Sequence, residues 1–168
     1  MKKILLLLSV VLLVVGCSTA MYNADGTKMT KEQIRAAKTQ YVRDAIANRQ
    51  FKINVDRMYP TRTPARHLSS LYSLEIKGDT IVSYLPYFGR AYNVPYGGGK
   101  ALNFTGIMSY YEPRQARNDE TIIEIGVENE EDIYVYQLSI FDNGNTDISV
   151  RSRNREYISF SGAMECHF

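Results

Sequence analysis

Apolar and polar side chains alternate with a period of two over most of the chain after residue 50, and this pattern limits the fold to antiparallel β architectures. Phe51, Ile53 and Val55 alternate with polar residues, as in a strand with one buried and one solvated face. Further strand candidates follow at residues 70–76, 80–85, 101–111, 121–128, 132–141, 146–151 and 156–161. No ten-residue helical pattern separates these strands, so a parallel α/β fold is disfavoured.

Two turn signals support this interpretation. Lys77-Gly78-Asp79 predicts a tight turn, and Asn143-Gly144 predicts a hairpin with a type I′ turn. About eight antiparallel strands must protect their edges, either by closing into a barrel or by pairing two sheets. We therefore predict a mainly β domain that forms an antiparallel barrel, with a two-sheet sandwich as the alternative.

One helix is expected before the strands. Thr30 and Gln33 have the spacing of a capping box at a helix N-terminus. The positions that follow at helical spacing on one face are Ile34, Ala37, Tyr41, Ala45 and Asn48. We expect an amphipathic helix at about residues 31–48, with this face packed on the β domain.

The N-terminus has the form of a bacterial secretion signal. Lys2 and Lys3 precede a run from Ile4 to Val15 that is aliphatic except for Ser9. A bilayer-spanning helix needs about 20 apolar residues, so this run suits a signal peptide better than a permanent anchor. Val14-Val15-Gly16-Cys17 resembles the lipobox of bacterial lipoproteins, in which the cysteine is acylated and the chain is cut before it. The alternative is an ordinary signal peptide with a chance cysteine.

The lipobox interpretation predicts three segments: a signal peptide at 1–16, a lipidated Cys17 with a tether at 17–29, and a single β-rich domain at 30–168. The membrane would be a partner through acyl chains, such as palmitate, on Cys17, since several chains anchor a soluble domain firmly. The residues after Cys17 contain no acidic run, so we expect a cell-envelope protein that faces the periplasm.

Composition excludes several classes of function. The 168 residues include 20 Lys+Arg and 18 Asp+Glu, and cleavage after residue 16 would remove Lys2 and Lys3 and leave 18 of each. A balanced charge is a poor match for nucleic acid, which needs a basic stripe. Two Cys and two His exclude a disulfide scaffold and a four-cysteine zinc site, and leave little material for a metalloenzyme. No cofactor is expected.

The segment from Tyr84 to Lys100 is the most distinctive in the chain, because it combines aromatic residues with proline and glycine. Aromatic faces at the lip of a cleft would stack on a sugar or an apolar ring. The alternative is a long loop that packs its rings over one end of the barrel. The candidate ligand-binding residues are Tyr84, Tyr87, Phe88, Arg90, Tyr92 and Tyr96.

Other motifs favour structural interpretations. Gly97-Gly98-Gly99-Lys100 lacks the spacing of a phosphate loop and predicts a flexible turn. Residues 142–147 offer oxygen ligands for calcium, but the Asn-Gly turn explains them better. The acidic residues at 128–132 predict an exposed turn, and Arg151, Arg153 and Arg155 share one face only if their strand continues to residue 155.

No catalytic motif is present in the sequence, so we expect a protein that is not an enzyme. Cys166 and His167 are neighbours near the C-terminus, but adjacency does not place the imidazole against the sulfur. We expect this pair to be inert.

The string Ile76-Lys77-Gly78-Asp79, followed by Val82-Ser83-Tyr84-Leu85-Pro86-Tyr87-Phe88-Gly89-Arg90-Ala91-Tyr92, resembles an uncharacterised Bacteroides-type family of envelope lipoproteins, domain of unknown function 4251. The resemblance covers about residues 30–164. It implies a lipoprotein with a β-rich, lipocalin-like barrel, and it implies no activity and no catalytic residues.

The resulting hypothesis is a non-catalytic, envelope-anchored module that binds a small apolar or glycan-like ligand. The alternative is a structural or protein-interaction lipoprotein of the envelope that uses the aromatic segment 84–100 as its partner surface. An open barrel interior would favour ligand binding. A packed interior with an exposed aromatic patch would favour interaction.

Overall fold

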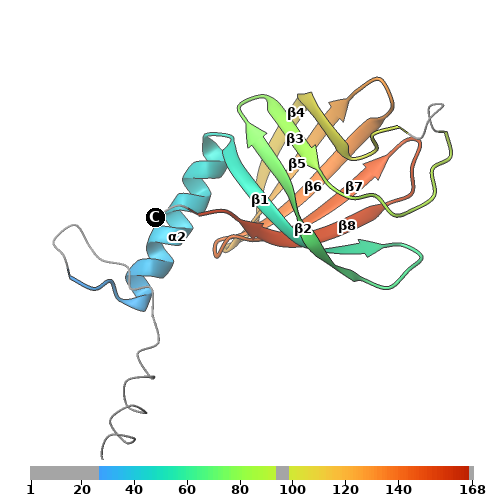
Figure 1. Cartoon of the computed structure of the whole chain (residues 1–168). Helices are drawn as coiled ribbons and strands as arrows, with labels where there is room; N and C mark the ends of the chain where they lie inside the picture. Colours follow the sequence, from blue (N-terminus) through green and yellow to red (C-terminus); the bar gives the residue numbers. More distant parts are fainter. Residues whose placement is uncertain (1–26, 94–98, 167–168) are drawn as a thin grey trace, which may run out of the picture. The chain divides into compact units, whose positions relative to one another are not determined.

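The computed structural model describes residues 27–93 and 99–166, and at residue 70 only the backbone (Figure 1). The chain divides into two compact units at Ile34/Arg35. In the first unit, Gln33 Nα donates to Thr30 Oγ1 over 3.2 Å, and Thr30 Nα donates to Gln33 Oε1 over 2.8 Å. These two bonds confirm the predicted capping box at the start of helix α2 (Lys31–Ala47).

The second unit contains a closed, antiparallel barrel of eight strands in up-and-down order, in which β1 pairs with both β2 and β8. The barrel prediction is therefore confirmed over the sandwich alternative. The strands are β1 (Gln50–Pro60), β2 (Arg66–Lys77), β3 (Thr80–Tyr84), β4 (Asn103–Arg117), β5 (Glu120–Glu128), β6 (Ile133–Phe141), β7 (Asn145–Ser152) and β8 (Ile158–Met164).

Strand β4 is longer than predicted, because its second half pairs with β5 alone. Strand β3 pairs with β4 only as far as Ile107, whereas β5 continues to pair as far as Arg117. One edge of this second half is free of ladder bonds to β3, so Pro113 can sit inside the strand despite its missing N–H.

The turn between β6 and β7 is not the predicted type I′ turn. A type I′ turn needs positive φ at both central residues, but Gly144 (φ 80°) has positive φ and Asn143 does not. Gly144 Nα donates to the Phe141 carbonyl over 2.7 Å. The connection is a three-residue loop with glycine in the left-handed position. The predicted tight turn at Gly78–Asp79 is confirmed, with Gly78 at φ 61°.

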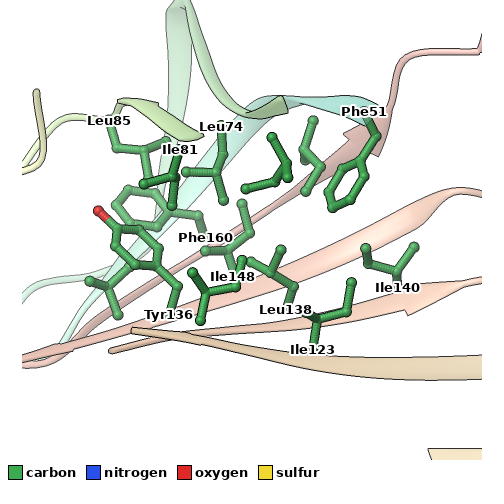
Figure 2. Close-up of a cluster of buried hydrophobic side chains, with 14 of the residues drawn as sticks. Phe51, Leu74, Ile81, Leu85, Ile123, Tyr136, Leu138, Ile140, Ile148 and Phe160 are labelled. Carbon is green, nitrogen blue, oxygen red and sulfur yellow. The ribbon is translucent and has the colours of Figure 1, made fainter. Parts of the chain in front are cut away.

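Large side chains fill the barrel interior (Figure 2). Among the largest fully buried side chains are those of Tyr134, Tyr136 and Phe160, and aliphatic residues from all eight strands or their ends surround them. Alternate residues along each strand point inward, as in β6, where Tyr134, Tyr136, Leu138 and Ile140 are buried. The interior is a packed core of the kind that small barrels can have.

Helix α2 covers one end of this barrel. Val42, Ala45 and Ile46 belong to the buried core, and Tyr111 Oη donates to the Ile46 carbonyl over 3.0 Å. The buried face is thus rotated from the predicted one: Asn48 is exposed and lies beyond the helix. No helix in the described part of the chain is long and apolar enough to span a bilayer.

Candidate functional site

The loop at residues 85–102 crosses the barrel end opposite helix α2. The helix leads into β1 beside the β2–β3 turn, where Gly78 Nα donates to the Arg49 carbonyl, whereas the loop starts at the other end of β3. The loop then reaches the β7–β8 connection: Tyr92 Nα donates to the Asn154 carbonyl, and Ala91 forms a β-bridge with Arg155. Residues 85–92 thus span the mouth from the end of β3 to the β7–β8 connection.

The underside of this loop is bonded to the barrel core. Leu85 and Leu102 are buried. Tyr136 Oη donates to Ser83 Oγ over 3.1 Å, and Ser83 Oγ donates to the Leu102 carbonyl over 2.7 Å. Burial raises the pKa of the Tyr136 hydroxyl. A hydroxyl chain that converges on the mouth is the kind of polar feature that orients a ligand, but here it binds the chain's own backbone.

A buried charge cluster holds the returning part of the loop. The side chain of Arg155 is 4% exposed, and its Nη2 lies 3.1 Å from Glu131 Oε2. Glu131 also accepts hydrogen bonds from the Lys100 and Ala101 amides, at 2.8 and 3.3 Å. Arg155 Nε lies 3.9 Å from the fully buried carboxylate of Asp132. This cluster therefore joins the β5–β6 turn, the β7–β8 connection and the end of the loop.

One prediction about these charges is wrong, and the condition for another is not met. The acidic turn at 128–132 is not wholly exposed, because Asp132 is buried and accepts hydrogen bonds from the Ile133, Arg153 and Asn154 amides. The arginine row is broken, because β7 ends at Ser152 and Arg155 turns inward. Both differences arise at connections between strands, where strand periodicity no longer sets side-chain direction.

The amides near the glycine run do bind an anion, but it is the Glu131 carboxylate of the same chain. Gly99 has φ 65°, and a Cβ there would lie 2.6 Å from Glu131 Oε2, so the close approach requires glycine. Residues 97 and 98 lie outside the described part of the chain.

Of the candidate residues, Tyr87 is the one whose contacts hold the loop in place. Its hydroxyl lies 2.8 Å from the Arg90 carbonyl and 3.0 Å from the Glu156 carbonyl, and it can donate to either. Burial raises the pKa of Tyr87. The Glu156 carboxylate accepts from Arg62 Nε over 2.8 Å and from the Arg90 amide over 3.3 Å, which lowers the pKa of Glu156. These bonds connect three loops at the same barrel end.

The other described candidates form an exposed surface. Tyr84, Phe88 and Tyr92 are 45%, 49% and 67% exposed, and Leu71, in an irregular stretch of β2, is 94% exposed. The guanidinium of Arg66 lies over the Phe88 ring at 5.2 Å, and the Tyr84 ring lies 5.3 Å from that of Tyr72. We call this surface the aromatic rim, and it consists of Arg66, Leu71, Tyr84, Phe88, Arg90 and Tyr92. Tyr96 lies outside the described residues.

The remaining candidates offer little chemistry. No group of three or more His, Cys, Asp or Glu side chains is arranged to hold a metal ion within residues 27–93 and 99–166. Burial raises the pKa of the Cys166 thiol, which opposes formation of a nucleophilic thiolate. His167 and Cys17 lie outside the described residues.

Sequence reasoning missed the buried cluster of Arg155, Glu131 and Asp132, and also Leu71. The four charged or polar residues from Glu128 to Glu131 gave a signal for a turn, but nothing in the sequence linked them to an arginine more than 20 positions later. The predicted strand at 70–76 includes Leu71 as a regular strand residue, whereas its pairing in β2 is irregular and its side chain is exposed.

Comparison with known proteins identifies the family. The family model described as "Domain of unknown function (DUF4251)" matches residues 33–164. A crystal structure of a DUF4251 family protein from Bacteroides eggerthii DSM 20697 has a TM-score of 0.58 and 13% sequence identity. That match covers 77% of this chain and 90% of the other, and at this identity it supports the fold alone. No curated protein matches the chain. The chain thus belongs to the DUF4251 family.

Proposed function

We propose that this protein is a lipid-anchored, non-catalytic interaction module of the cell envelope that binds a partner protein through the aromatic rim. One observation carries the proposal: side chains fill the barrel interior and both ends are covered, whereas Tyr84 at the end of β3 and Phe88 and Tyr92 of the loop are exposed. A small ligand inside the barrel would have to displace core residues. A partner at the rim displaces only water.

The composition of the rim supports a protein partner. Tyrosine and arginine are enriched among the residues that dominate binding energy at protein interfaces. Among the described residues, seven large hydrophobic side chains are exposed, and Leu71, Tyr84, Phe88 and Tyr92 are four of them. Two exposed arginines, Arg66 and Arg90, lie among these side chains, so the complementary surface would be apolar with carboxylates.

The proposed anchor is compatible with this use of the rim. Within the barrel unit, α2 leads into β1 at the barrel end opposite the loop. Acylation of Cys17 would hold the domain at a membrane that faces the periplasm. Metabolic labelling tests this: we expect the native chain to incorporate palmitate and to fractionate with membranes, and Cys17→Ser to do neither. Palmitate incorporation by Cys17→Ser would contradict the anchor.

Photo-crosslinking in living cells tests the partner surface. A benzophenone amino acid at position 88 or 92 should give a discrete crosslinked protein that is lost when Tyr84→Ala and Arg90→Ala are introduced together. The matched control position is Ala116, which is exposed on β4 near the other barrel end. Equal crosslinking from all three positions would argue against a specific surface.

Native mass spectrometry of the same purified protein separates the alternatives. A co-purifying small molecule that disappears with Tyr92→Ala would replace the interaction proposal with the ligand-binding hypothesis. Binding of the pure protein to phosphatidylglycerol vesicles through the rim would assign the surface to lipid instead.

A further inference from the structure

A concave surface lies on the outside of the barrel, and no residue of the aromatic rim lines it. It is a hollow of about 500 Å³ lined by Asp56 of β1, Asn145 and Asp147 of β7, Ser161 and Gly162 of β8, and residues of the β6–β7 connection. This volume lies within the usual range for small-molecule sites, about 300–1,000 Å³.

The hollow follows from the side-chain sizes on three adjacent strands. The outward residues of β8 are small, namely Ser159, Ser161 and Ala163. On one side, Asp147 pairs with Ser161, and on the other β1 bulges at Asp56. Neighbouring strands are about 4.8 Å apart, so the two carboxylate walls stand about 10 Å apart across β8. That width accepts one sugar ring with its hydroxyls.

The walls carry hydrogen-bonding groups that the fold leaves wholly or partly unused. The carboxylates of Asp56 and Asp147 are exposed, and neither has a hydrogen bond or ion pair within the described residues. Asn143 Oδ1 accepts from the Asn145 amide, and its NH₂ group takes no part in that bond. Carboxylates accept, amide NH₂ groups donate and the Ser161 hydroxyl does both.

An aromatic ring borders this polar hollow. Tyr59 of β1 pairs with Ser159, but its hydroxyl lies 3.2 Å from Ser161 Oγ, the next outward residue of β8. The Tyr59 side chain is 37% exposed, and its hydroxyl contacts a residue that lines the hollow. A ring face next to mixed donors and acceptors suits a pyranose, which has apolar C–H faces and a hydroxyl edge.

We propose that this hollow, which we call the β8 groove, is a binding site for a neutral oligosaccharide. A cationic ligand would find the two carboxylates, but it would leave the amide donors and the Tyr59 face unused. An oligosaccharide uses all of these groups. This site is independent of the proposed partner surface, because no residue of the aromatic rim lines it.

Nuclear magnetic resonance titration of the full chain tests the proposal. The ¹⁵N-labelled protein would be held in dodecylphosphocholine micelles, which contain no sugar, and titrated with chitotetraose and with maltoheptaose. At least one sugar should shift the amide signals of residues 145–147 and 161–163 in a saturable way, with an affinity of about 1 mM or tighter. Asp56→Ala with Asp147→Ala should weaken this affinity by about tenfold or more, since each removes a charged acceptor.

Two controls keep the outcomes distinct. Asp119→Ala removes an exposed carboxylate from the β4–β5 turn, and Tyr92→Ala alters the rim; both should leave sugar binding unchanged. Unchanged spectra with both sugars at about 10 mM, or sugar-induced shifts confined to the loop at 85–102, would overturn the groove assignment. Shifts at the groove with a lysine decapeptide but with neither sugar would overturn it in favour of a cationic ligand.

Discussion

Arg155→Met should destabilise the protein far more than a typical arginine substitution, because Arg155 is the buried cation that holds the loop-covered end. Methionine keeps much of the side-chain length but removes the charge and all hydrogen bonding. It therefore removes the bond to Glu131, the proximity to Asp132, and the contact of the guanidinium with the Tyr87 ring at 5.6 Å. The carboxylates of Glu131 and Asp132 would remain.

The magnitude can be built from these contacts. A charge-assisted hydrogen bond contributes roughly 2–3 kcal/mol, and the cation–π contact about 0.5–1 kcal/mol. Loss of the cation beside Asp132 costs about 1 kcal/mol rather than more, because three backbone amides still bind that carboxylate. Arg155 Nε has no hydrogen-bond partner among the described residues, and its removal returns about 1 kcal/mol. The net loss is about 3 kcal/mol.

Urea unfolding of the chain from residue 18 measures this loss. We expect a lower midpoint with an unchanged m value, and a melting temperature roughly 12 °C lower. The Lys100 and Ala101 amides donate hydrogen bonds to the Glu131 carboxylate. Hydrogen exchange at these two amides should become faster, because Glu131 loses its bond to Arg155. The control is Lys77→Met, in which a more exposed pair with Glu75 is broken and the midpoint should hardly change. Equal midpoints for the two variants would refute the assigned role of Arg155.

Three further predictions concern the core, one strand pair and pH. Ser83→Ala should cost about 1–3 kcal/mol in urea unfolding, because it leaves the Tyr136 hydroxyl without its acceptor and removes one of the two donors to the Leu102 carbonyl, to which the Leu85 amide still donates. Tyr136→Phe should cost less, about 1 kcal/mol, and the reverse order would contradict the hydroxyl chain. A Cβ on Gly126 would lie 2.2 Å from the Tyr110 ring, so Gly126→Ala should cost about 1–3 kcal/mol alone and close to nothing in a Tyr110→Ala background, as a double-mutant cycle would measure. Burial raises the pKa of Tyr111 to about 12, against about 10 in the unfolded chain. The protonated Tyr111 hydroxyl therefore contributes its full stabilisation below pH 10, and this stabilisation declines as the pH rises from about 10 to 12. Tyr111→Phe should reduce that decline when unfolding is measured as a function of pH.

Much of the fold could be predicted because local patterns determine it. Alternation defined the eight strands, glycine marked the turns, and the capping residues Thr30 and Gln33 placed the helix start. The barrel followed from the need to protect strand edges. The errors lie in the strand ends and turns: the predicted strand at 101–111 stops short of the end of β4 at Arg117, and the Asn-Gly pair predicts a type I′ turn although the chain uses three residues there.

The loop-covered end could be predicted only in part. The aromatic segment indicated either a cleft lip or a packed loop, and composition alone does not show which rings turn inward. Tyr87 and Phe88 are adjacent, yet Tyr87 packs on the core while Phe88 is half exposed. The two side chains differ because the Tyr87 hydroxyl bonds to the carbonyl of Glu156. That residue is 69 positions later in the sequence and is within reach only in the folded barrel. Such long-range pairings have no signature in a single sequence.

The energetics of the covered mouth favour sites on the outer surface of the barrel. An interior ligand would have to break the bonds of Glu131 to the loop amides and of Ser83 to the Leu102 carbonyl before it could enter. If these contacts stabilise the closed loop by only about 4 kcal/mol, the open form is about one molecule in a thousand, and the apparent affinity of an interior ligand falls by the same factor. The aromatic rim and the β8 groove require no such opening. A partner or a sugar that bound there would keep its full interaction energy, because no core contact would have to break first.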